Sequence, residues 1–230
     1  VRRAALAVHV APERAELLLC LARADGLFSA RTSVRSVSER LVQVWRRGGA
    51  WDESAVEPDL FRPGQRSSCR ATVLIREAVL ETLLLVAAGE FALQADIEAV
   101  ACSDRRALSA QRALVSSRPP GTPARSDAEL ASGVLEVARA LLTRSLPALG
   151  MVDHGRVEAG PVVRLSHEAR RWLERAQAGQ LGVDEAPRAS AVFRGDTQLA
   201  CDFDGDVGAI VEVARYGTVW LEDHAIVVGF

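Results

Sequence analysis

The spacing of apolar residues is most clearly helical between residues 127 and 142. Apolar side chains recur there every three or four residues, at Leu130, Val134, Val137, Ala138, Leu141 and Leu142. Asp127 is a typical helix N-cap, and Pro147 and Gly150 are residues that end helices. We therefore expect a helix here with one buried face.

Two short apolar runs, 151–152 and 162–165, follow this helix. The residues between them have turn composition, which predicts a β-hairpin. Ser166 then caps a further helix, with Ala169, Trp172, Leu173 and Ala176 on one side. Helix, hairpin and closing helix are the second half of a winged helix-turn-helix, which usually lays a helix in the DNA major groove.

The first half of such a module precedes it. Residues 70–88 form the most apolar stretch and predict a buried helix. Residues 90–93 alternate like a strand, and 94–102 predict a short helix. The recognition helix should follow at once, but residues 103–128 intervene. We expect a helix over 104–116 and a flexible Pro/Gly/Ser-rich loop over 116–126.

The flanking segments differ in type. Helices are predicted over 11–25 and 36–47, and a linker over 179–187. Beyond it the period shortens, predicting strands near 191–193, 199–203, 219–221 and 225–228 around a helix over 207–216.

The expected fold class is mainly α, with a winged helix-turn-helix (α+β) and a small C-terminal α+β unit. The expected domains are an N-terminal helical unit (1–66), a winged-helix unit with the insertion (67–178), and the α+β unit (188–230). The chain starts at Val1 and ends within an apolar run at Phe230, so we expect a fragment of a larger polypeptide.

Composition limits the function. The 230 residues are 49% hydrophobic and 25% charged, without a membrane-spanning apolar run or signal-peptide pattern, which favours a soluble, cytoplasmic protein. All 28 basic residues are arginine, a bias that GC-rich codon usage explains. Without lysine, neither a phosphate-loop lysine nor a Schiff-base lysine is possible.

Charge and cysteine spacing are equally informative. The net charge of −2 argues against strong autonomous DNA binding, although it permits a local arginine patch. The four cysteines, Cys20, Cys69, Cys102 and Cys201, form no Cys-x-x-Cys pair. We therefore expect neither a metal site nor disulfides, and no cofactor.

Three possible chemical sites each have a simpler interpretation. Residues 202–206 resemble half a calcium loop, but a turn in which Asp204 or Asp206 caps the next helix fits better. Glu77 and Glu81 could pair as catalytic carboxylates, but a solvated helix face with Arg76 nearby is the plainer interpretation. His154 and His167 are expected on the surface. We predict no catalytic residue and no enzyme activity.

The strongest candidate site is a strip of side chains around the predicted wing that could meet DNA phosphates. It comprises Arg139, Thr143, Arg144, Arg156, Arg164, Arg170 and Arg171. The alternative is that these arginines are ordinary solubilising charges, some paired with Glu136, Glu168 and Glu174.

Three segments carry a resemblance to a known family: residues 41–51 (LVQVWRRGGAW), residues 145–173 (SLPALGMVDHGRVEAGPVVRLSHEARRWL), and residues 199–230 with VEVARYG and the ending VVGF. Together they resemble bacterial proteins similar to the amino-terminal region of XPB/Ssl2-type DNA helicases. The resemblance implies a non-catalytic region that helps ATP-driven machinery to engage DNA or partner subunits. The insertion at 103–128 and the lack of net positive charge depart from that family.

The sequence thus predicts a non-enzymatic accessory region of a helicase-like protein that engages DNA through a winged helix. The alternative is a protein–protein interaction or dimerisation module on a winged-helix scaffold, without direct DNA binding. The expected partners are DNA and a partner protein or the remainder of a helicase-like polypeptide.

Overall fold

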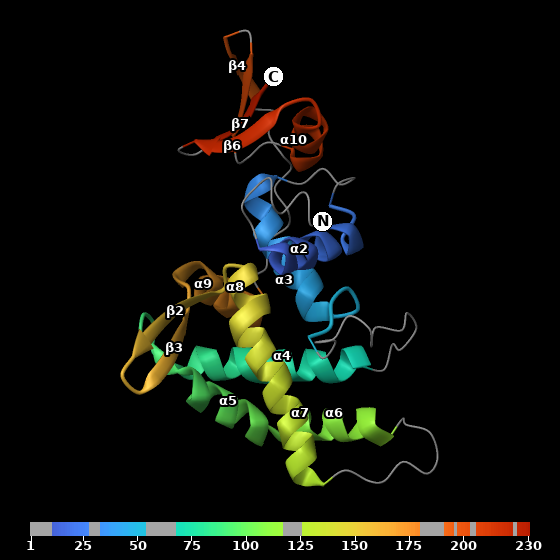
Figure 1. Ribbon diagram of the computed structural model, residues 1–230, viewed down its shortest axis with the longest axis vertical. Helices are drawn as coiled ribbons and strands as arrows, with labels where there is room; N and C mark the ends of the chain where they lie inside the picture. Colours follow the sequence, from blue (N-terminus) through green and yellow to red (C-terminus); the bar gives the residue numbers. More distant parts are fainter. Residues whose placement is uncertain are drawn as a thin grey trace. The chain divides into compact units, whose positions relative to one another are not determined.

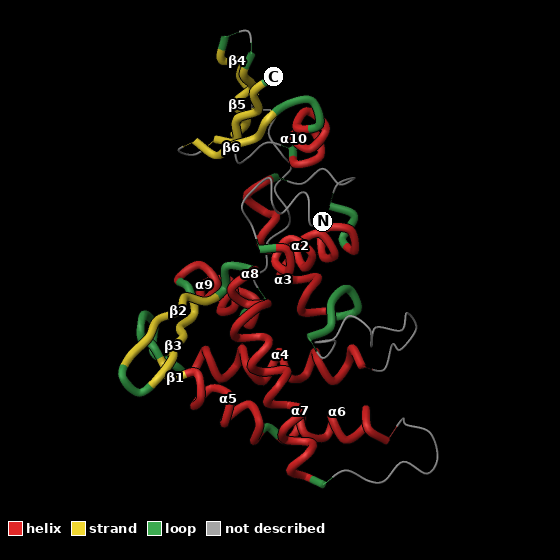
Figure 2. The backbone as a smooth tube through the Cα atoms, in the orientation of Figure 1, coloured by secondary structure: helices red, strands yellow, loops and turns green. Residues whose placement is uncertain are grey.

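The computed structural model describes residues 11–27, 33–53, 68–116, 126–179, 191–195, 197–202, 206–222 and 225–230. These residues form a mixed α+β structure that is mainly helical, with two small antiparallel sheets (Figure 2). The mainly α class with a small C-terminal α+β segment is therefore confirmed.

The chain divides into two compact units. The first unit comprises Val1–Leu18 and Trp45–Gln180, and the second comprises Leu19–Val44 and Leu181–Phe230. The sequence does not predict that residues 19–44 group with the C-terminal segment. The expected domain boundaries stay predictions, and the loop over 117–125 and the linker over 180–187 lie outside the described residues.

The helices lie close to where the apolar spacing predicts them. In chain order they are α2 (Pro12–Ala24), α3 (Val34–Arg47), α4 (Ser68–Leu85), α5 (Gln94–Ser103), α6 (Arg105–Ser116), α7 (Asp127–Ala140), the π-helical turn η2 (Leu141–Ser145), α8 (Leu146–Ala148), α9 (His167–Gln177) and α10 (Val207–Ala214). In the first unit α7 crosses α4 and packs against α5 and α6 (Figure 1).

The first sheet has three strands, β1 (Ala92–Leu93), β2 (Val152–Val157) and β3 (Gly160–Leu165), in the order β1-β3-β2. β2 and β3 form the expected hairpin, and β1 pairs antiparallel with β3. The face with Val152, Val163 and Leu165 is buried, and helices α4, α5 and α8 contact these strands. The sheet therefore joins a strand that follows α4 to the hairpin that follows α7 and α8.

Two details of the α7 region correct the sequence prediction. Ser126, not Asp127, is the N-cap, and it forms a capping box with Glu129. Pro147 does not stop the helix, because it lies inside α8 after the π-helical turn. A proline ring in a regular helix clashes with the carbonyl four residues earlier, and the wider turn relieves that clash. Gly150, with φ of 69°, ends the helix as expected.

An ion pair lies at the centre of the first unit. Arg76, on α4, has a fully buried side chain and donates through Nε and Nη2 to Oε2 of Glu53, at 3.0 and 2.5 Å. It also donates to the carbonyls of Trp45 and Trp51. Oε1 of Glu53 accepts from the Trp45 indole at 2.7 Å and from the Ser145 hydroxyl at 2.8 Å. Four polar side chains thus connect α3, the following loop, α4 and the π-helical turn.

The second sheet has the order β4-β5-β7-β6, with β4 (Ala191–Arg194), β5 (Gln198–Asp202), β6 (Thr218–Glu222) and β7 (Ala225–Gly229). All neighbouring strands are antiparallel. One face packs on α10, where Leu199, Cys201 and Ile210 form a core with Val213 and Ile226. Asp206 N-caps α10, accepting from the Gly208 amide at 2.8 Å.

No helix within the described parts of the chain combines the length and apolarity that a membrane crossing requires.

Candidate nucleic-acid interface

The seven predicted contact residues lie on five elements of the first unit: α7, η2, the two strands of the hairpin, and α9. Arg139 is on α7, Thr143 and Arg144 are on η2, Arg156 and Arg164 are on the hairpin, and Arg170 and Arg171 are on α9. Each element forms where the apolar pattern predicts it. The structure separates these residues by what their side chains contact.

Four of the arginines are exposed to solvent, and three of these, Arg144, Arg156 and Arg171, differ from Arg139 in their contacts. Within the described ranges none of these three makes a hydrogen bond or ion pair to another side chain. An exposed guanidinium group without a protein partner is available to a phosphate oxygen, and its fork of donors matches that geometry. These three side chains are the core of the candidate interface.

Arg139 is exposed but paired. Its Nη2 lies 3.1 Å from Oε2 of Glu98 on α5, and this hydrogen bond raises the pKa of the guanidinium. Thr143 donates its hydroxyl to the Arg139 carbonyl at 2.7 Å, four residues back along the helix. A phosphate would therefore compete with Glu98 for Arg139, and Thr143 uses its donor within the helix.

Arg164 lies on the other face of the hairpin from Arg156. The register pairs Arg164 with Asp153 and Arg156 with Pro161, and side chains alternate between faces along a strand. Arg164 donates to Oδ2 of Asp153 at 3.1 Å and to the Gly89 carbonyl at 3.2 Å. Its guanidinium also lies 4.6 Å from the centre of the Phe91 ring. The two hairpin arginines consequently do not form one strip.

Arg170 binds backbone carbonyls at the C-terminal end of α4. Its guanidinium donates to the carbonyls of Leu83 and Leu84 at 3.3 Å each, and to that of Val86 at 2.5 Å. The last carbonyls of a helix lack partners within the helix, and a cation there also complements the helix dipole. Arg170 therefore holds α9 against the C-terminal end of α4, a role that the sequence does not reveal.

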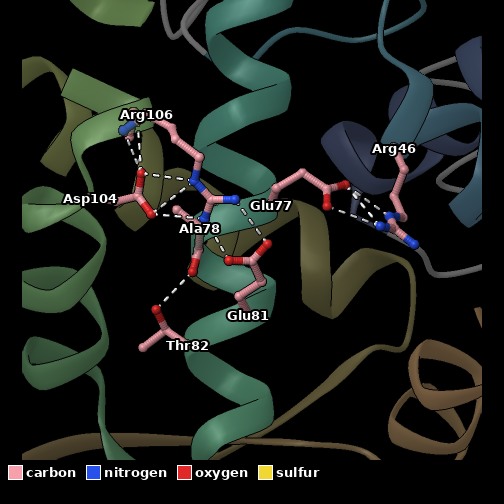
Figure 3. Close-up of polar contacts among 8 residues, drawn as sticks. Arg46, Glu77, Ala78, Glu81, Thr82, Asp104 and Arg106 are labelled. Carbon is pink, nitrogen blue, oxygen red and sulfur yellow. Dashed lines mark hydrogen bonds and ion pairs between the residues drawn. The ribbon is translucent and has the colours of Figure 1, made fainter. Parts of the chain in front are cut away.

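The carboxylates considered as a catalytic pair have separate partners (Figure 3). Glu77 accepts a bidentate interaction from Arg46, and Glu81 accepts from Arg106 at 2.5 Å. Arg106 also binds Asp104, which lowers the pKa of the Asp104 carboxyl. Both glutamates are thus partly exposed ion-pair partners, as the plainer interpretation expects. That interpretation is wrong about Arg76, which is buried and bonded to Glu53.

The other chemical alternatives also have simple outcomes. Asp206 caps α10, as the turn interpretation expects, while residues 203–205 lie outside the described part. His154 and His167 are exposed. In the portions of the chain that the structure describes, no three His, Cys, Asp or Glu side chains gather in a way that could hold a metal ion.

Sequence reasoning missed an apolar surface on the outer face of the hairpin. The Phe91 ring, 44% exposed, lies against Gly155, where an added Cβ would be 3.5 Å from the ring. Val157 lies on the same face of β2 as Gly155 and is 49% exposed. The alternation of residues 90–93 predicts the strand but not which side of it stays uncovered.

Comparison with known proteins identifies no similar protein. No protein-family model, no curated protein and no solved structure matches this chain.

Proposed function

We propose that the first unit is a winged-helix module that binds duplex DNA without base specificity. The observation that carries the proposal is the order of elements. A helix (α4), a strand (β1) and further helices ending in α7 precede a hairpin whose second strand pairs with β1. This order resembles that of a winged helix with one additional helix, α6. In such modules the recognition helix, the role that we assign to α7, lies against DNA.

The exposed arginines support the same role. Arg144 follows directly on α7, Arg156 is near the tip of the hairpin, and Arg171 is on the closing helix. Arg156 projects from the same sheet face as Val152 and Val163, the face that is buried where helices α4, α5 and α8 contact the strands. Contacts from arginine to phosphate fix orientation and carry no sequence information, which suits a binder of low specificity.

The resemblance to the amino-terminal region of XPB/Ssl2-type helicases extends this proposal. On that basis the chain is a non-enzymatic, cytoplasmic accessory region that holds DNA for an ATP-driven motor. The net charge of −2 supports weak binding that a linked motor would reinforce, since phosphate neutralisation supplies most non-specific affinity.

Fluorescence anisotropy with a labelled duplex at about 50 mM salt tests DNA binding. A variant with Arg144, Arg156 and Arg171 changed to glutamine should bind the duplex at least about tenfold more weakly. The slope of log K against the logarithm of the salt concentration should also become shallower, by about two to three. A control variant removes the same charge from the exposed residues Arg14, Arg23 and Arg215. If the two variants bind equally, the proposal is wrong.

A second function, docking of a partner protein, is favoured by the apolar surface of Phe91 and Val157. Half-exposed apolar side chains that share one face of a sheet are typical of protein contacts. Capture of a partner that resists high salt but is lost in Phe91→Ser would support this function. The arginine variant above should not affect such a complex, so the two functions can be separated.

A further inference from the structure

The edge strand β6 of the second unit is uncovered along its whole length. All five residues from Thr218 to Glu222 are exposed, including Val219 at 41%, Trp220 at 37% and Leu221 at 67%. Among the described residues β6 pairs with β7 alone, in a continuous register without a bulge. An apolar edge strand carries a row of unpaired backbone donors and acceptors, and it readily pairs with a further strand.

Protections found on many edge strands are absent from β6. Proteins usually shield an edge with a proline, a bulge or charged side chains in its middle. Here the sequence is Thr-Val-Trp-Leu-Glu, with its single charge at the end. The Glu222 carboxylate is already paired within the protein, because it accepts a hydrogen bond from Arg194 of β4 at 2.8 Å.

The opposite edge strand differs. β4 also has an exposed apolar residue, Val192 at 65%, but it ends in Arg194 and its remaining described residue, Ala191, is small. The Arg194–Glu222 pair joins strands that are not neighbours in the sheet, so the sheet curves toward this face. Buried Val227 and Ala200 lie on that concave face, and Trp220 is paired with Val227. Among the side chains that the structure describes on the two edges, β6 therefore presents the larger apolar surface.

We propose that β6 pairs antiparallel with β6 of a second copy of this chain, about a two-fold axis at Trp220. In this register Val219 lies opposite Leu221, Trp220 opposite Trp220, and Thr218 opposite Glu222 of the second copy. Apolar residues thus meet apolar residues on both faces, and no two like charges face one another. The pattern is self-complementary, as a two-fold interface requires.

The side-chain faces fit the same pairing. Val219 and Leu221 lie on the sheet face that packs on α10, because their β7 partners, Val228 and Ile226, lie there. Pairing would extend the four strands to a continuous sheet of eight, with a cross-strand aromatic pair on the other face. Cross-strand pairs of this kind stabilise a sheet. A five-residue edge is small beside stable interfaces, so the dimer should be reversible.

Sedimentation equilibrium of the whole chain over about 5–300 µM tests the proposal, a range suited to small interfaces. Wild type should show a monomer–dimer equilibrium. Leu221→Glu should weaken dimerisation at least about tenfold, because it places a carboxylate opposite Val219 of the second copy. The double variant Val219→Lys/Leu221→Glu should recover most of the affinity, because the register sets the introduced lysine of one copy opposite the introduced glutamate of the other.

The matched control is Val192→Glu, an equally exposed apolar residue on the other edge, which should leave dimerisation unchanged. Circular dichroism and the unfolding midpoint of each variant verify folding. A wild type that stays monomeric at about 300 µM overturns the proposal, since even small interfaces associate in that range. So does a double variant that is no better than Leu221→Glu, or a Val192→Glu variant that abolishes the dimer. DNA binding by the first unit is independent of each result.

Discussion

Arg76 and Glu53 form an ion pair inside the first unit, with Nη2 2.5 Å from Oε2 and side chains that are 0% and 1% exposed. Charges are costly to bury, and this pair is compensated by further hydrogen bonds to Trp45, Trp51 and Ser145. The Arg76 guanidinium also lies 4.8 Å from the Trp45 ring centre. The loop after α3 is thereby held against α4 and the π-helical turn.

Removing one partner of this pair should destabilise the first unit strongly. Arg76→Met keeps much of the volume of the side chain but leaves the Glu53 carboxylate buried without its cation. We expect a loss of about 3–5 kcal/mol in the free energy of unfolding. Urea unfolding followed by tryptophan fluorescence measures it, since Trp45 is buried beside the pair.

An exposed pair supplies the control for that experiment. Glu81→Gln breaks the ion pair between Glu81 and Arg106, whose side chains are 47% and 49% exposed, respectively. The free energy of unfolding should fall by less than about 1 kcal/mol. Equal losses for the two variants would show that burial does not determine the contribution of Arg76.

The Asp104 carboxyl should make stability depend on pH. Its pKa lies below the ordinary value of 3.8, first because Arg106 donates to it and also through the amides of Ala107 and Arg106. Because the pKa is lower in the folded state, the ionised carboxyl stabilises the fold fully at pH values above 3.8. This stabilisation is lost as the pH falls through the lower pKa of the folded state.

Asp104→Ala should therefore cost about 0.5–2 kcal/mol at neutral pH, since the carboxylate also accepts from the first amides of α6. The difference from wild type should shrink as pH falls below about 4. Urea titrations at several pH values check this, and a difference that grows toward acid would contradict the assignment.

Neighbouring arginines on α9 should behave in opposite ways. Arg170 binds the last carbonyls of α4, so Arg170→Met should lower stability by about 1 kcal/mol or more, because it leaves half-buried carbonyls unpaired. Arg171 is exposed, so Arg171→Met should alter stability by less than about 0.5 kcal/mol and should weaken DNA binding. Thermal unfolding and DNA titration of both variants measure this contrast. A stability loss in Arg171→Met would refute it.

The N-terminus of α7 depends on one hydroxyl. The Ser126 hydroxyl oxygen accepts a hydrogen bond from the Glu129 amide, and the Ser126 amide donates to Oε2 of Glu129 at 2.7 Å. Ser126→Ala should cost about 0.5–2 kcal/mol, and Asp127→Ala should cost less, because Asp127 is the first residue inside the helix. Urea unfolding of the two variants compares them, and a larger loss at Asp127 would restore the cap that the sequence suggests.

The local pattern of the sequence was sufficient for the positions of the elements. Helices α4, α5, α7 and α9, the hairpin, and the strands of the second sheet lie within a few residues of their predicted positions, because apolar periodicity and turn residues act over short distances. Helix ends were less certain. Ser126 and Asp127 are both good caps, and the backbone geometry decides between them.

The candidate site shows a different limit. The sequence identified seven residues around the hairpin, but it could not show that Arg164 and Arg170 have partners within the protein. Those partners are an Asp153 carboxylate across the hairpin and carbonyls of α4 more than 80 residues away. Exposure of Arg144, Arg156 and Arg171 is likewise a property of the assembled structure.

Apolar spacing located the helices and strands, and the absence of lysine excluded lysine chemistry. The burial of Arg76, which we expected beside the solvated face of Glu77 and Glu81, depends on contacts that form only when the chain folds. Arg76 is also three residues from Val79 and seven from Leu83, so it shares their buried face. A single helix cannot show whether an arginine on that face has a carboxylate to meet. That carboxylate, Glu53, comes from a loop 23 residues earlier, and the folded chain brings the two together.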